Sequence, residues 1–134
     1  ENKPIEIYNN GEMYRDFTYV EDLVLAIRKL LEVVPVESKK KPLKSNDSIS
    51  QVAPFRIVNI GNSEKIKLID FIESIEESLQ MKAIRKYMPM QKGDVPETWA
   101  DTSLLDDLIG YRPKTNFRDG ISSFIKWYRN YYNI

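Results

Sequence analysis

The chain has 134 residues, of which 42% are hydrophobic and 30% are charged, a composition typical of a single folded domain with its own core. Twenty lysines and arginines balance twenty acidic residues, so no net field attracts the chain to nucleic acid or to an anionic membrane. The absence of cysteine and histidine excludes disulfides, Cys/His zinc sites and catalysis by a thiol or an imidazole. The sequence contains neither a long apolar run nor an amino-terminal signal region, and we therefore expect a cytoplasmic protein.

The first part of the chain is predicted to contain two extended segments followed by a helix. Residues 5–8 alternate apolar and polar side chains, and the turn at residues 9–11 consists of residues that tolerate positive φ. Aromatic and β-branched side chains predict a second extended segment over residues 13–20. Apolar residues then recur at helical spacing, which predicts a helix over residues 20–34 that ends at Pro35.

Residues 35–54 are predicted to form a flexible surface loop. They contain a lysine run at residues 39–41, several serines and no sustained apolar period. The lysines could form an anion site, but the composition favours a solvated linker.

The next part is predicted to be a strand, a turn and a helix. Residues 55–60 have the composition of a strand, Gly61 closes it, and residues 68–79 have an apolar helical face. Three glutamates of this helix are predicted on its outer, solvated side (Glu73, Glu76 and Glu77). The remaining elements are predicted to be a strand over 83–88, a loop over 89–98, a short helix capped by Asp101 or Thr102 and ended by Gly110, and a last helix over 117–132.

Two common chemical interpretations are disfavoured. A dinucleotide-binding turn needs three closely spaced glycines, whereas Gly61 stands alone, so an ordinary turn is favoured there. Adjacent carboxylates, as at residues 76–77 and 106–107, do not share a face of a helix and are predicted to be surface charge.

Two polar clusters are better candidates for a site. Residues 15–22 place a cation and carboxylates where an extended segment becomes a helix, and there Arg15 could bind a ligand or pair with Asp16 or Asp22. Residues 91–96 place polar groups on a loop loosened by glycine, which could bind a polar ligand or form a plain surface turn.

Three segments, in this order, resemble those of the extended short-chain dehydrogenase/reductases: RDFTYVEDLVLAI (15–27), VNIGNS (58–63) and MQKGDVPETWAD (90–101). With the GYRPKT segment and the closing GISSFIKWYRNYY, the strongest likeness is to the UDP-glucuronate 4-epimerases of polysaccharide synthesis. The resemblance spans nearly the whole chain, but it covers only the carboxy-terminal part of such an enzyme.

The resemblance implies an α/β fold, the carboxy-terminal part of an NAD(P)-binding Rossmann-like protein. Helix 20–34 and strand 55–60 would belong to the Rossmann sheet layer, and the remainder to the small substrate lobe. It also implies that the glycine-rich NAD turn and the catalytic Tyr-x-x-x-Lys pair lie in an absent amino-terminal part. We therefore expect this chain alone to bind no NAD and to be inactive, whereas the longer parent would convert UDP-glucuronate to UDP-galacturonate as a homodimer formed through the absent part.

The resemblance also implies roles for four residues. Arg15 would meet the diphosphate of a UDP-sugar, Tyr8 would lie against uracil, and Asp94 would accept a hydrogen bond from the ribose. Gln91 stands where many relatives have a second phosphate-binding arginine. No catalytic residue and no metal ligand is implied within this chain.

Two other functions remain open at this point. The chain could be the same portion of another nucleotide-sugar epimerase, dehydratase or decarboxylase. It could also be an interaction module without a small-molecule site. The group that binds the sugar carboxylate is implied to lie outside this chain, so the sugar stays undecided.

Overall fold

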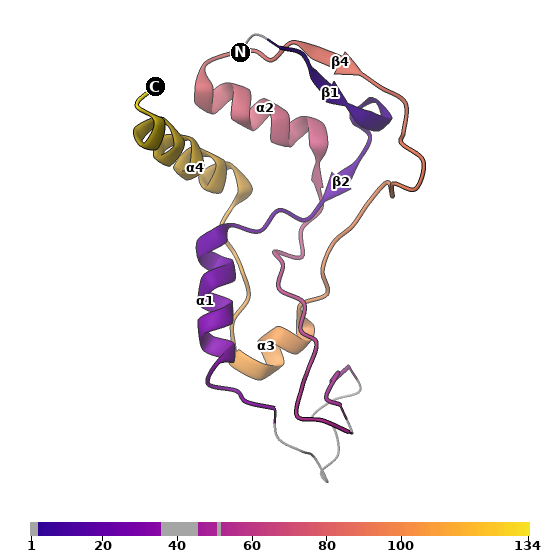
Figure 1. The fold of residues 1–134 in the computed structure, drawn as a ribbon, viewed down its shortest axis with the longest axis vertical. Coiled ribbons are helices and arrows are strands. Elements are labelled where there is room, and N and C mark those ends of the chain that lie inside the picture. The colour runs from indigo at the N-terminus through magenta and orange to yellow at the C-terminus, as the bar shows by residue number, and fades with distance from the viewer. Residues whose placement is uncertain (1–2, 36–45, 51) are drawn as a thin grey trace.

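A computed structural model describes residues 3–35, 46–50 and 52–134 of the chain and has a mixed α/β architecture. Figure 1 shows α2 and α4 side by side near one end of the molecule, with the paired strands β1 and β4 beyond α2, and α1 and α3 together toward the other end. The elements in chain order are β1 (Ile5–Ile7), the short 3-10 helix η1 (Tyr8–Gly11), β2 (Tyr14–Arg15), α1 (Val20–Leu30), β3 (Ile66–Lys67), α2 (Leu68–Leu79), β4 (Arg85–Tyr87), α3 (Ser103–Ile109) and α4 (Phe117–Tyr132).

The strands form two small sheets whose partners are distant in the sequence. β1 pairs in parallel with β4, so that Ile5 lies opposite Arg85, and β2 pairs antiparallel with β3. The turn between β1 and β2 has positive φ at residues 9–11, as its composition predicts, with values of 49°, 51° and 83°. The two strands that flank this turn pair with other segments and not with each other.

The predicted bounds of α2 and α4 are confirmed, and the two helices pack on each other. Gly110 ends α3 with a φ of 60°, also as predicted. Within the part of the chain that the structure describes, the small core is formed by eight buried apolar side chains (Ile7, Met13, Ala26, Ile66, Leu104, Leu105, Ile121 and Ile125).

Helix α1 is shorter than predicted, because it ends at Leu30 and not at residue 34. Hydrogen bonds from Glu32 N to Lys29 O and from Val33 N to Leu30 O join residues only three apart, so the helix tightens at its end. Helical φ and ψ are also disfavoured at the residue before a proline, which explains why the helix does not reach Pro35. The apolar stripe of α1 is only partly covered: Ala26 is buried, whereas Val20 and Val24 are 60% and 57% exposed.

Residues 55–60 are not a strand, contrary to the prediction from their composition. A strand needs a hydrogen-bonding neighbour, and none of the described strands pairs with this segment. Isolated contacts hold the segment instead: Ile57 N donates to Ser48 Oγ at 3.0 Å, Phe55 O accepts from Ser50 N at 3.0 Å, and the side chain of Asn59 donates to Asp101 O at 3.2 Å.

The lysine run at residues 39–41 lies outside the described residues, so the flexibility of the loop over residues 35–54 stays a prediction. Within its described part, Asp47 accepts a hydrogen bond from Arg56 Nε at 2.9 Å, and the Asp47 side chain is fully buried.

Glu76 is buried rather than solvated, which corrects its predicted place on the outer side of α2. Its carboxylate accepts hydrogen bonds from Arg85 Nη2 and Lys82 Nζ, each at 2.8 Å, and from Ala83 N at 3.1 Å. The two cations and the backbone donor outweigh the effect of burial and lower the pKa of Glu76 from 4.5 to about 2. The carboxylate therefore ties α2 to β4 through charged hydrogen bonds.

We expect Glu76→Gln to lower the thermal unfolding midpoint at pH 7 by several degrees, because the variant leaves Arg85 and Lys82 without their shared charge. A carboxylate with a lowered pKa stabilises the fold above its unfolded value of 4.5, and this contribution is lost as the pH falls toward about 2. The acid dependence of stability should therefore flatten between these pH values in the variant, as measured by thermal scans at several pH values.

The matched control is Glu77→Gln on the same helix. Glu77 pairs with Arg118 at 3.1 Å, but both side chains are more than half exposed, so little stability should be lost. Equal effects of the two substitutions would contradict a special role of Glu76.

Candidate functional site

Arg15 and Asp94 come together from positions 79 residues apart. Arg15 Nη2 lies 2.9 Å from Asp94 Oδ1, and Arg15 Nη1 donates to the backbone oxygens of Tyr14 at 2.8 Å and Pro96 at 3.4 Å. The side chains of Arg15 and Asp94 are 28% and 31% exposed, so both can still be reached from solvent. Arg15 thus pairs with neither Asp16 nor Asp22, the two partners that the sequence suggested.

The guanidinium of Arg15 keeps open hydrogen-bonding capacity. An arginine has five N–H donors, and the contacts above occupy three of them. Two N–H groups of Arg15 therefore have no acceptor within the described part of the chain. A planar cation with open donors suits an anionic ligand such as a phosphate or a carboxylate.

Asp94 is held by the geometry of its own turn. Asp94 N donates to Gln91 O at 3.3 Å, and Gly93 has a φ of 85°, the left-handed value required at the third position of a type II turn. Open space surrounds the Cα of Gly93, so only its backbone conformation demands glycine. Asp94 Oδ1 also accepts a hydrogen bond from Val95 N at 2.8 Å, which orients the carboxylate toward Arg15.

Tyr8 of η1 lies near Gln91, which is in the loop that follows β4. The Tyr8 hydroxyl donates to Glu6 Oε2 at 2.8 Å, and this bond, together with burial, raises the pKa of Tyr8. The side chain of Gln91 approaches the same hydroxyl and acts in the opposite direction on this pKa. A tyrosine with a raised pKa stays protonated, which fits a role in contact rather than in catalysis.

The loop between these two pairs is anchored at both of its ends. In η1, Asn10 N donates to Met88 O at 3.0 Å, and in β2, Tyr14 N donates to Pro96 O at 2.9 Å. The four site residues predicted from the sequence thus lie around one turn of this loop: Gln91 and Asp94 belong to the turn, with Gln91 near Tyr8 of η1 and Asp94 near Arg15 of β2.

Asp16 organises the site, and sequence reasoning missed this role. Its carboxylate accepts hydrogen bonds from three backbone N–H groups, those of Asn62 at 3.0 Å, Ser63 at 2.9 Å and Ala100 at 3.1 Å. These donors are 46 to 84 residues away in the chain, so no local pattern could identify them.

The turn at Gly61 does not fit the pyrophosphate of a dinucleotide. The backbone N–H groups of Asn62 and Ser63, which a phosphate would need, already donate to Asp16. Helix α2 begins only at Leu68, so the turn does not lead directly into a helix. Gly61 allows close packing instead: a Cβ there would lie 2.5 Å from Ala100 Cβ and 2.7 Å from Asp16 Oδ2.

Tyr111 is used to anchor the start of α1. Its hydroxyl donates to Asp22 Oδ1 at 2.6 Å, and Asp22 Oδ2 accepts from Thr115 N at 2.8 Å. Burial and the neighbouring Asp22 raise the pKa of Tyr111 to about 12, so this tyrosine is unsuited to act as a base near neutral pH. Burial raises the pKa of Asp22, but the hydrogen bonds from Tyr111 and Thr115 outweigh it and lower that pKa.

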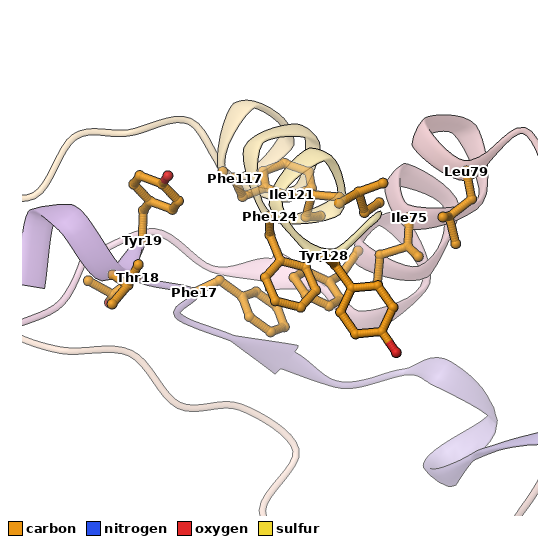
Figure 2. Close-up of a pocket in the computed structure, with 13 residues that line it drawn as sticks. Phe17, Thr18, Tyr19, Ile75, Leu79, Phe117, Ile121, Phe124 and Tyr128 are labelled. Atoms are coloured by element: carbon orange, nitrogen blue, oxygen red, sulfur yellow. The ribbon is translucent and has the colours of Figure 1, made fainter. Parts of the chain in front are cut away.

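A separate apolar groove of about 540 Å³ lies between α2, α4 and residues 17–20 (Figure 2). Phe17 stacks on Phe71 in this groove with a centroid separation of 3.9 Å, and Tyr128 lines it from α4. None of the side chains that line the groove is charged, so it offers no group that could bind a phosphate.

Among the residues that the structure describes, no group of three or more acidic, cysteine or histidine side chains could hold a metal ion. No helix of the same residues has the length and apolar character needed to cross a membrane.

A model of the family described as GDP-mannose 4,6 dehydratase matches residues 1–124. The chain belongs to this family. This membership, together with similar proteins and solved structures, confirms the resemblance to the carboxy-terminal part of extended short-chain dehydrogenase/reductases and the α/β fold that it implies.

Several members of known name are similar to the chain. A probable UDP-glucuronate 4-epimerase of Rhizobium meliloti is 42% identical over 131 residues, which cover 97% of this chain and 38% of the relative. UDP-glucuronate 4-epimerase 1 of Arabidopsis thaliana is 35% identical to the chain. This match covers 97% of the chain and 30% of the Arabidopsis protein. The chain thus spans less than half the length of these relatives.

A solved structure agrees with this relationship. The UDP-glucuronic acid 4-epimerase of Bacillus cereus, in complex with UDP-glucuronic acid and NAD, superposes with a TM-score of 0.69 at 28% identity. The match covers 95% of this chain and 36% of that protein.

We expect Gly61→Ala to destabilise the fold by about 1–3 kcal/mol, the usual cost of overpacking. The added methyl group would meet Ala100 and Asp16 at distances that real Cβ atoms do not adopt, so the three segments joined by Asp16 must move apart. Chemical denaturation would measure the loss.

The double variant Gly61→Ala/Ala100→Gly removes one of these two clashes and should recover part of the stability lost in Gly61→Ala. An unchanged unfolding midpoint in the single variant would contradict the close approach at Gly61.

Proposed function

We propose that this chain is the UDP-sugar-binding portion of a longer, NAD-dependent UDP-glucuronate 4-epimerase, called the parent protein below. The observation that carries the proposal is the Arg15–Asp94 pair, because it combines a partly exposed cation that has open donors with an acceptor on a hydrogen-bonded turn. The similarity to named UDP-glucuronate 4-epimerases over nearly the whole chain supports the same assignment.

The four residues would divide the UDP group among them. Arg15 would donate its open N–H groups to the diphosphate, and Asp94 would accept from a ribose hydroxyl. Tyr8 would lie against uracil, and the exposed amide of Gln91 would stand beside the nucleotide in place of a second cation. A protein that uses one cation here has less charge to offer the diphosphate, so more of the affinity would depend on Arg15.

The cofactor would bind outside this chain. The turn at Gly61 does not fit the NAD pyrophosphate, since Asp16 already occupies the backbone donors at residues 62–63. In the parent protein NAD would supply the hydride transfer that inverts the sugar. The residues of this chain would hold the nucleotide end, so that the sugar stays in place throughout the reaction.

The proposal includes a setting for the parent protein. It would be a cytoplasmic homodimer that associates through the part outside this chain, and its product, UDP-galacturonate, would serve polysaccharide synthesis. The resemblance of the sequence to UDP-glucuronate 4-epimerases supports these features.

The second candidate is the same portion of another nucleotide-sugar enzyme. The groups proposed to bind UDP would contact the nucleotide and not the sugar, so they are compatible with this second candidate as well. Assay of the parent protein with UDP-glucuronate, UDP-glucose and UDP-galactose would distinguish the two, and a preference for a neutral sugar would overturn the first proposal.

We expect the isolated chain to show no epimerase turnover and no tight NAD binding, whereas the parent protein, expressed from the full reading frame, should interconvert UDP-glucuronate and UDP-galacturonate. The reason is that the sequence of this chain contains neither a glycine-rich dinucleotide turn nor a Tyr-x-x-x-Lys pair. Product analysis by chromatography would measure turnover. Epimerisation by the purified chain alone, free of host enzyme, would contradict the expectation that catalysis needs the part of the parent protein outside this chain.

In the parent protein, Arg15→Ala should weaken UDP binding by about one to two orders of magnitude, because a charge-assisted hydrogen bond contributes about 1.5–3 kcal/mol. Isothermal titration calorimetry would give the dissociation constants. The matched control is Lys92→Ala, which removes the same charge from the exposed loop that carries Asp94 and should change the affinity little. A change of less than about threefold in a folded Arg15→Ala variant would show that Arg15 is structural.

A further inference from the structure

We infer that Asp94 is a positioning residue, which holds the Arg15 guanidinium in the orientation in which it binds the diphosphate. This inference rests on the proposed function and adds to it, because the role proposed above for Asp94 concerns only the ribose.

The first observation is the way in which Arg15 is held. Its contacts with the backbone oxygens of Tyr14 and Pro96 both involve Nη1, whereas Nη2 is held by Asp94 alone within the described residues. A planar group fixed at one nitrogen can still change its tilt. The bond to Asp94 fixes a second nitrogen, and the two together define the plane of the guanidinium and the direction of its open donors.

The second observation is that Asp94 is itself fixed. Its Oδ1 accepts from Val95 N at 2.8 Å, and its backbone closes the turn that begins at Gln91. The bond from Tyr14 N to Pro96 O ties the loop to β2. The carboxylate of Asp94 is therefore fixed relative to the same strand that carries Arg15. Such support by neighbouring groups is what keeps a binding side chain in a productive geometry.

Because Asp94 is charged, the direction in which its removal changes the phosphate affinity tests the inference. A carboxylate beside a diphosphate site repels the ligand, so an Asp94 without a positioning role would weaken phosphate binding, and its removal would tighten it. If Asp94 positions Arg15, its complete removal should instead weaken phosphate binding, although the repulsion has gone.

Two variants of the parent protein separate charge from orientation. Asp94→Asn keeps an oxygen that can accept from Arg15 Nη2 and Val95 N, but removes the charge. Asp94→Ala removes both. The probe is inorganic pyrophosphate, which contains no ribose and therefore does not report on the role of Asp94 toward the nucleoside.

We expect calorimetry to show pyrophosphate binding about five- to tenfold weaker in Asp94→Ala, and equal to the unaltered protein or tighter in Asp94→Asn. In the Arg15→Ala background, the further change Asp94→Ala should have no additional weakening effect, because the group that it orients is gone. Uridine, measured in parallel, would report the ribose contact separately.

Pyrophosphate affinity that is unchanged or increased in Asp94→Ala would overturn the positioning role while leaving the proposed function intact, provided that the unaltered protein binds UDP. The same weakening by Asp94→Ala with and without Arg15 would also overturn it. Failure of the unaltered parent protein to bind UDP would overturn the proposed function and this inference together.

Discussion

The arrangement of this chain depends on one carboxylate, that of Asp16. Three backbone N–H groups from two distant segments converge on it, and a carboxylate that accepts several backbone bonds is a strong fixed point. Because Asp16 directly follows Arg15, the contacts that join the segments also fix the position of the backbone at Arg15, the last residue of β2. Gly61 completes the junction, since any larger residue there would push the turn away from Asp16.

Two ionic clusters of the structure differ in a way that separates stability from binding. The carboxylate of Glu76 is buried and surrounded by two cations and a backbone donor, so its own oxygens are already satisfied within the protein. The pair of Arg15 and Asp94 is about one third exposed and keeps open donors. A saturated, buried cluster holds elements together, whereas an open one at the surface can exchange solvent for a ligand.

The parts of the fold that follow from local spacing could be predicted, and the parts that depend on distant partners could not. The bounds of α2 and α4 follow from apolar periodicity, and the end of α3 from Gly110. Residues 55–60 have the composition of a strand but no described partner strand, and Glu76 looked solvated because Arg85 does not share its helix.

The same distinction holds for the candidate site. The polar clusters around Arg15 and Asp94 were visible as residue types at a chain transition and on a glycine-containing loop. Their direct contact was not, because 79 residues separate them. The role of Asp16 was hidden for the same reason, since its donors lie far away in the sequence.

The parallel pairing of β1 with β4 has a consequence for how the chain acquires its structure. Ile5 is opposite Arg85, Asp16 bonds to a residue 84 positions later, and Asp22 to one 93 positions later. Contacts of such long range are closed slowly, because a large loop must lose its freedom before any bond rewards it. During synthesis β1 therefore has no partner strand until β4 has been made, and Asp22 cannot bond to Thr115 until the polypeptide has been extended past that residue. This interval is when the nascent chain would benefit most from a chaperone.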